Sequence, residues 1–220
     1  MRPIGIFGGT FDPIHFGHLR PALELMEGLG LQEVRLVPSA IPPHRNTPSA
    51  PGTHRLEMVR RAVKGQAGFV VDERELRRAG ISYMVDTLAS LREEFGETPL
   101  CLLLGMDAFL QLDRWHRWAE IPELAHIVAT HRPGWSLESV APSAAMADLL
   151  QRRRVSRPEA LAEQPAGGIL LQSVTQLDIS ATAIREAVGR GRSARYLTRD
   201  TVLDYIAEHH LYQQPHSARV

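Results

Sequence analysis

The sequence has little cysteine, no net charge and no long apolar run. Cys101 is its single cysteine, so no disulfide can form within the chain. We expect this thiol to be a core residue in a reducing compartment, because it lies in the apolar run 100–104. Lysine plus arginine and aspartate plus glutamate both number 25, which leaves no global field to attract nucleic acid or a membrane surface. No signal-peptide pattern or apolar stretch of roughly 18 residues is present. We therefore expect a cytoplasmic protein with small-molecule partners.

The segment 4–18 also lacks two common nucleotide-binding signatures. It contains neither the lysine of a P-loop nor a Gly-x-Gly-x-x-Gly fingerprint. The short apolar run 4–7 leads instead into Gly8-Gly9-Thr10-Phe11-Asp12-Pro13-Ile14-His15-Phe16-Gly17-His18, and then into a helix-like stretch to about residue 29. Two glycines let the backbone approach a ligand, and a helix start binds anions. With His15 and His18 three residues apart, the segment predicts a site of phosphate chemistry.

Apolar runs alternate with helix-patterned segments along most of the chain. Strands are predicted at 3–7, 33–37, 68–71, 100–104, 126–130 and 168–171, and helices near 18–29, 53–65, 81–95 and 143–154. Such alternation predicts an α/β fold, a Rossmann-like doubly wound parallel sheet. Ligands bind such sheets at the carboxyl ends of the strands, where the loops 8–18, 38–45, 105–107 and 131–134 are expected. We assign residues 1–178 to this core and residues 179–220 to a small C-terminal helical extension, with helices at 179–188 and 198–209.

The C-terminal extension begins with a second candidate phosphate site, Asp178-Ile179-Ser180-Ala181-Thr182-Ala183-Ile184-Arg185. Ser180 is a good N-cap. Both hydroxyls and the first-turn amides can donate to phosphate oxygens, and Arg185 is long enough to fold back toward the same anion. A triphosphate held by histidines, helix starts and an arginine indicates attack at the α-phosphate with loss of pyrophosphate.

The first motif is similar to the Gly-x-Phe-Asp-Pro-x-His-x-Gly-His signature of the nucleotidylyltransferase superfamily, which pairs it with a late Ile-Ser-x-Thr-x-x-Arg. Over nearly its whole length the chain resembles the bacterial nicotinate mononucleotide adenylyltransferases. The matching segments are 42–45, 72–76, 81–83, 105–107, 115–116 and 131–134. The resemblance implies an enzyme of NAD biosynthesis that transfers the adenylyl group of ATP to nicotinate mononucleotide, giving deamido-NAD and pyrophosphate.

The resemblance also implies roles for particular residues. His15 and His18 would act on the α-phosphate and Arg185 would bind the leaving pyrophosphate, so these three are the catalytic candidates. The ATP-binding candidates are Gly8, Gly9, Thr10, Phe11, His15, His18, Gly105, Asp107, Ile179, Ser180, Thr182 and Arg185. The mononucleotide-binding candidates are Gly9, His44, Arg45, Tyr83, Met84, Trp115, His116 and Arg132, with Trp115 stacking on the pyridine ring and Arg132 pairing with the phosphate.

Magnesium is expected to arrive with the substrate. No carboxylate cage is evident, so Mg²⁺ would be held by nucleotide and water. Asp12 and Asp107 are candidates for outer contacts, although a turn-stabilising role is favoured for Asp12. A homo-oligomer is compatible with the sequence, which carries no signal that decides it.

Met84 departs from the family pattern, which commonly has threonine there. A thioether cannot donate a hydrogen bond, so recognition of the pyridine carboxylate would rest on backbone N–H groups. Three other readings stay open: a phosphopantetheine adenylyltransferase, a catalytically silent nucleotide-binding module, and a cytidylyltransferase that uses CTP.

Overall fold

One parallel sheet forms the centre of the molecule. The computed structural model describes residues 1–42, 47–78, 80–131 and 142–213. Within these residues seven strands pair in the order β3-β2-β1-β4-β5-β7-β6, every pair parallel. The strands are β1 (Ile4–Gly9), β2 (Glu33–Pro38), β3 (Phe69–Val71), β4 (Leu100–Gly105), β5 (His126–His131), β6 (Arg154–Val155) and β7 (Ile169–Ser173). The predicted parallel sheet is confirmed. β6 was not predicted, because two residues carry no pattern of their own.

The long helices follow the predicted positions closely. They are α1 (Phe16–Gly28), α2 (Gly52–Val63), α4 (Met84–Phe95), α7 (Ala144–Arg153), α8 (Ala181–Gly189) and α9 (Asp200–Glu208). The short ones were not predicted: α3 (Arg74–Arg77), α5 (Met106–Phe109), α6 (Ile121–Leu124), and the 3₁₀ turns η1 (Leu112–Arg114), η2 (Trp118–Glu120) and η4 (Pro158–Ala162). A helix of one turn is too short to show a hydrophobic period. No described helix is long and apolar enough to span a membrane.

Both faces of the sheet are buried, as β4 shows residue by residue. Leu100, Leu102 and Leu104 pack in the cluster that contains α4 and α7, whereas Cys101 and Leu103 pack in the cluster that contains α1. Alternate side chains of a strand point to opposite faces, so an uninterrupted apolar run marks a strand covered on both sides. Cys101 is fully buried, which confirms the prediction that it is a core residue.

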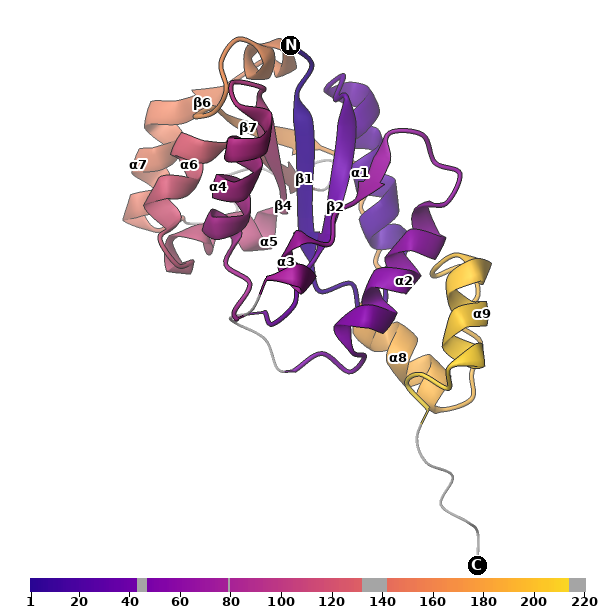
Figure 1. Ribbon diagram of the computed structural model, residues 1–220. Helices are drawn as coiled ribbons and strands as arrows, with labels where there is room; N and C mark the ends of the chain where they lie inside the picture. The colour runs from indigo at the N-terminus through magenta and orange to yellow at the C-terminus, as the bar shows by residue number, and fades with distance from the viewer. Residues whose placement is uncertain (43–46, 79, 132–141, 214–220) are drawn as a thin grey trace, which may run out of the picture.

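The carboxyl ends of the strands gather at one edge of the sheet, the lower edge in Figure 1. The two C-terminal helices leave the sheet and lie beside α2 near that edge. Val202 and Ile206 of α9 pack against Met58 and Val59 of α2. The fold thus brings α8 close to the β1–α1 turn.

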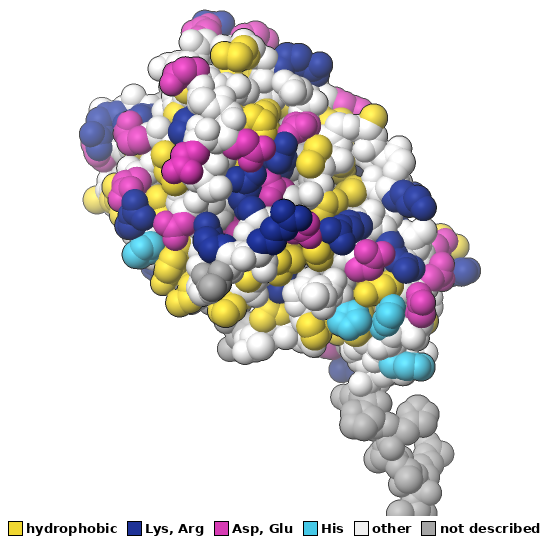
Figure 2. Space-filling model, viewed as in Figure 1, with side chains coloured by type: hydrophobic (Ala, Val, Ile, Leu, Met, Phe, Trp, Pro, Cys, Tyr) yellow, Lys and Arg dark blue, Asp and Glu magenta, His cyan; other side chains and the backbone are white. Residues whose placement is uncertain are grey.

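On the face seen in Figure 2, positive and negative side chains are interspersed, in keeping with the balanced composition.

Candidate active site

The first motif forms the turn between β1 and α1. His15 is the residue before α1, with extended backbone (φ −151°, ψ 172°), and His18 lies in the first turn. The helix therefore begins two residues earlier than predicted. The two imidazole rings stack, with centroids 3.7 Å apart and planes 28° apart. Both histidines are consequently at a helix N-terminus, where the backbone favours a bound anion.

The two histidines differ in environment. The backbone N–H of His15 donates a hydrogen bond to Nδ1 of His18 at 3.3 Å. Nδ1 is thus an acceptor, which leaves Nε2 of His18 as the ring nitrogen that can donate. Burial lowers the pKa of His15 to about 4, and only 5% of this residue is exposed. Its Nδ1 is buried without a hydrogen-bond partner among the described residues. His15 is therefore neutral at pH 7, and its ring can supply a hydrogen bond to a phosphate oxygen without carrying charge.

A side chain at either glycine before the loop would meet a neighbouring side chain closely. A Cβ on Gly8 would lie 2.4 Å from Cε of Met84, and one on Gly9 would lie 2.8 Å from the ring of Phe11. The Phe11 residue is 2% exposed, and its ring meets that of His18 edge-on at a centroid distance of 5.2 Å. The Phe11 side chain therefore supports the His18 ring, and a contact of Phe11 with ATP stays a prediction.

The second motif lies against the first. The Ser180 hydroxyl accepts a hydrogen bond from the N–H of Ala183 at 3.1 Å and so caps α8, as predicted. The Arg185 guanidinium folds back: Nη1 donates to the backbone carbonyl of Asp12 at 2.7 Å, and Nη2 donates to the Thr182 hydroxyl at 3.2 Å. The carbonyl oxygen of Ile179 would lie 3.2 Å from a Cβ on Gly17. The two predicted phosphate sites therefore face one another.

Asp12 joins segments that are distant in sequence. Its carboxylate accepts hydrogen bonds from the N–H groups of Ser49 and Ala50, at 2.6 and 3.2 Å, and from the Tyr212 hydroxyl at 2.6 Å. Asp12 therefore holds distant segments together, instead of stabilising only its own turn. Its side chain is 6% exposed and its carboxylate oxygens already have these partners, so it is poorly placed for an outer-sphere contact to a metal ion.

Arg55 anchors the same loops and was not predicted. This arginine is 1% exposed, and its guanidinium donates to the carbonyls of Ala50, Thr10 and Ala40 at 3.1, 2.7 and 3.2 Å. Three neutral acceptors satisfy a buried cation here, while Asp12 contributes a nearby negative charge. Nothing in the local pattern of α2 distinguishes Arg55 from a surface arginine.

Residues of the first motif line two cavities. The larger, about 660 Å³, is lined by Gly8, Gly9, Thr10, Ser39, Pro42, Glu75, Ser82, Tyr83, Met84, Gly105, Asp107, Ala108, Gln111, Arg114, Trp115 and His116. The smaller, about 280 Å³, is lined by Phe7, Gly17, His18, Pro21, Ala22, Leu25, Leu103, Leu104, Gly105, Thr130, Gln176 and Leu177. Gly105 borders both. Asp107, predicted on the ATP side, lies on the larger cavity.

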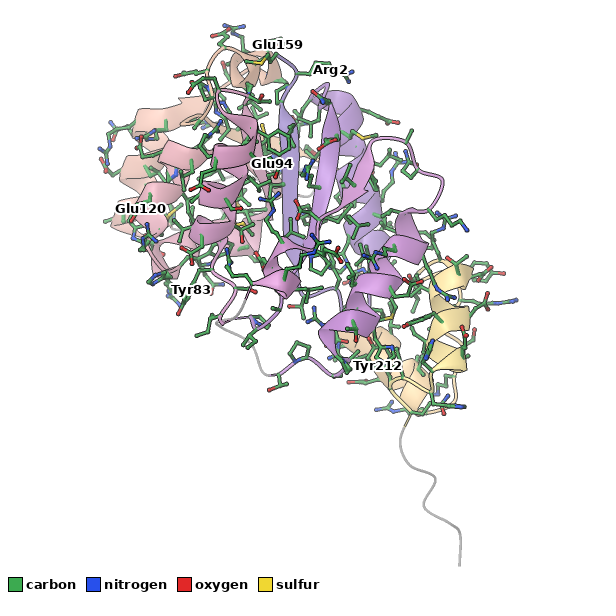
Figure 3. The ribbon with its side chains drawn as sticks, in the orientation of Figure 1. Arg2, Tyr83, Glu94, Glu120, Glu159 and Tyr212 are labelled. Carbon is green, nitrogen blue, oxygen red and sulfur yellow. The ribbon has the colours of Figure 1, made fainter. Side chains whose placement is uncertain are left out.

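The wall of the larger cavity is aromatic on one side. The rings of Tyr83 and His116 lie 4.1 Å apart at 31°, and Trp115 packs partly buried against the core. Met84 is the first residue of α4, so backbone N–H groups of the first turn lie at this wall. In Figure 3, Tyr83 projects from the chain just before α4. This arrangement suits a flat ring with an anionic substituent.

Several polar residues of this cavity were not predicted. Glu75 is buried, which raises its pKa, and it accepts a hydrogen bond from the Thr87 hydroxyl at 2.6 Å. Ser82 accepts from the N–H of Ala40 at 2.9 Å. They occur singly in the sequence, so no spacing marked them. Arg114 also lines the cavity. His44, Arg45 and Arg132 lie outside the described residues.

Comparisons with known proteins agree with the geometry. The model of the cytidylyltransferase-like family matches residues 6–187. A probable nicotinate-nucleotide adenylyltransferase of Halorhodospira halophila is 50% identical over 215 residues, which cover 98% of this chain and 97% of the relative. A protein of the same name from Aeromonas salmonicida is 48% identical, covering 96% of this chain and 97% of the relative.

Solved structures share the fold at much lower identity. The nicotinic acid mononucleotide adenylyltransferase of Plasmodium falciparum, complexed with NaAD, superposes with a TM-score of 0.70 at 15% identity, covering 96% of this chain and 98% of that one. The same enzyme complexed with APC gives 0.68 at 16% identity, with the same coverage.

Proposed function

The chain belongs to the cytidylyltransferase-like family and, within it, to the nicotinate-nucleotide adenylyltransferases. We propose that the two cavities beside the first motif bind ATP and nicotinate mononucleotide, and that the enzyme transfers the adenylyl group of ATP to the mononucleotide. The products are deamido-NAD and pyrophosphate.

One observation supports this assignment most directly: the first motif, which carries the stacked histidine pair, contributes residues to the lining of two cavities. Gly8 and Gly9 border the larger cavity, His18 borders the smaller, and Gly105 borders both. A reaction that joins two nucleotides needs two binding regions that meet at the α-phosphate. We assign the larger, aromatic cavity to the mononucleotide and the smaller to the adenosine side.

The chemistry is derived from this placement. A phosphate oxygen of the mononucleotide attacks the α-phosphorus of ATP, forming a new P–O bond, and the bond to the bridging oxygen of pyrophosphate breaks. His15 and His18 donate hydrogen bonds to the α-phosphate oxygens as charge builds. The N-terminus of α8 and Arg185 bind the departing pyrophosphate, since a helix start and a guanidinium both favour it. Most of the acceleration comes from positioning and charge stabilisation.

Recognition of the mononucleotide is assigned to residues of the larger cavity. Trp115 stacks on the pyridine ring, beside Tyr83 and His116. The first-turn N–H groups of α4 bind its carboxylate, because the Met84 side chain offers no donor. From the sequence resemblance, Arg132 and Arg45 are assigned to the phosphate and His44 to the mononucleotide.

Magnesium enters this proposal as part of the substrate MgATP. The described residues contain no group of three or more histidine, cysteine or acidic side chains arranged to hold a metal ion. We assign the ion to the phosphates and water, which Mg²⁺ accepts readily. Residues 179–220 are proposed to work with the core as one functional unit. A cytoplasmic location remains a prediction, and a homo-oligomer is compatible with the sequence.

Replacing His18 tests the chemical assignment. We expect His18→Ala to lower turnover by orders of magnitude, because a donor to the α-phosphate is lost, while circular dichroism shows an intact fold. Turnover near that of the wild type would contradict the role of His18.

Two kinetic comparisons test the substrates. Arg132→Ala should raise the KM for the mononucleotide far more than the KM for ATP, whereas equal effects would place the acceptor phosphate elsewhere. ATP should be preferred over CTP, and preference for CTP would favour the cytidylyltransferase reading.

A further inference from the structure

Two adjacent residues after α8 hold the backbone on both sides of His15. The Thr198 hydroxyl donates to the carbonyl of Ile14 at 2.8 Å, and the carbonyl of Leu197 accepts a hydrogen bond from the N–H of Phe16 at 3.0 Å. Thr198 is 1% exposed, so its bond lies in the interior. The peptide groups immediately before and after His15 are thereby fixed by a segment more than 180 residues away.

These bonds satisfy groups that local structure leaves open. Phe16 is the first residue of α1, so its N–H has no acceptor within the helix. Ile14 is fully buried, and its carbonyl needs the partner that the Thr198 hydroxyl supplies. The His15 ring has no hydrogen bond at Nδ1 among the described residues. The backbone around His15 and the stacking with His18 therefore help to fix the position of this ring.

The C-terminal region, by which we mean residues 179–213, also forms hydrogen bonds with Asp12 at the start of the loop. The Tyr212 hydroxyl donates to Oδ1 of Asp12 at 2.6 Å, and Arg185 donates to the Asp12 carbonyl at 2.7 Å. Figure 3 places Tyr212 where α2 and α8 meet. Burial and the neighbouring Asp12 raise the pKa of Tyr212, so the phenol stays protonated and can donate. Every second residue of the loop, Asp12, Ile14 and Phe16, is therefore bonded to the C-terminal region.

We propose that Thr198 and Tyr212 are positioning residues that fix His15 in its catalytic geometry, so that the C-terminal region organises the first motif as well as binding pyrophosphate. This inference rests on the proposed function. His15 acts as charge builds on the α-phosphate. A small displacement of its ring therefore weakens the stabilisation of the transition state more than it weakens the binding of the substrates. A displacement of about 1 Å is enough to cost about 100-fold in rate.

The first experiment compares Thr198→Val with Thr198→Ser and with a matched control, Thr201→Val. The Thr201 hydroxyl also donates to a carbonyl, that of Arg61 at 3.2 Å, but on the α2 side of the C-terminal region. Thr198→Val should lower kcat ~10- to 100-fold while both KM values change little. Thr198→Ser, which keeps the hydroxyl, should retain most of kcat, and Thr201→Val should match the wild type. Equal kcat in Thr198→Val and the wild type would overturn the proposal.

A double-mutant cycle with His15 separates positioning from general loosening. If Thr198 acts through His15, then Thr198→Val should have almost no further effect on the residual single-turnover rate of His15→Gln. An undiminished loss in that background would overturn the proposal. Should Thr198→Val fail to fold by circular dichroism, Tyr212→Phe carries the test, with a fall in kcat expected and an unchanged kcat refuting it. Absence of adenylyl transfer by the wild type would instead defeat the proposed function.

Discussion

The neutral state of His15 makes the stability of the protein depend on pH in a calculable way. Burial lowers the pKa of His15 from 6.5 to about 4 in the folded protein. Between these values the unfolded chain binds a proton that the folded protein does not, so the free energy of unfolding falls as the pH falls through this window. The gap corresponds to about 3 kcal/mol, and because His15 is 5% exposed we apply no reduction for solvent screening.

The assay is urea denaturation of wild type and His15→Gln at several pH values between 4 and 7, followed by tryptophan fluorescence. Glutamine cannot titrate, so the stability difference between the two proteins should move by about 3 kcal/mol toward the variant on going from pH 7 to pH 4. Other shifted groups, such as His126 and Glu75, are present in both proteins and cancel. Parallel stability curves would refute the assignment of His15 as a buried neutral donor.

Three further predictions concern side chains that are buried or in close contact. Gly8→Ala should raise the KM for the mononucleotide and leave the KM for ATP unchanged, because the new methyl forces the Met84 thioether toward the larger cavity; Met84→Ala in that background should restore it in steady-state kinetics. Cys101, fully buried and with its pKa raised to about 12, should resist iodoacetamide until the protein unfolds, as mass spectrometry would show. Arg55→Met should lower the free energy of unfolding, measured by urea denaturation, by about 3 kcal/mol, because it leaves three backbone carbonyls without their hydrogen-bond donor. A stability equal to that of the wild type would contradict that reasoning.

The sheet was predictable because its signal is local and repeated. The run Leu100–Leu104 is apolar without alternation, and a strand covered on both faces needs that pattern. The helix start was misplaced by two residues because His15, unlike serine or aspartate, is not a common residue before a helix. Short turns such as α5 depend on tertiary packing, which a single sequence does not display.

The candidate site also contains residues that the sequence predicts and residues that only the fold reveals. His15, His18, Ser180 and Arg185 could be predicted because each lies in a compact motif whose spacing serves phosphate chemistry. The bonds that hold the motif could not, since Thr198 and Tyr212 are 184 and 200 residues from their acceptors. Single polar residues between distant elements carry no periodicity, so only the folded chain brings them together.

The most direct measurement is pyrophosphate release from MgATP with nicotinate mononucleotide, its amide or phosphopantetheine supplied in turn. We predict turnover with the mononucleotides and preference for the acid, which backbone donors at α4 and the aromatic wall of the larger cavity would recognise despite Met84. Turnover with phosphopantetheine alone would contradict the assignment of that cavity, and no release with any acceptor would contradict the assignment of the histidine pair to adenylyl transfer.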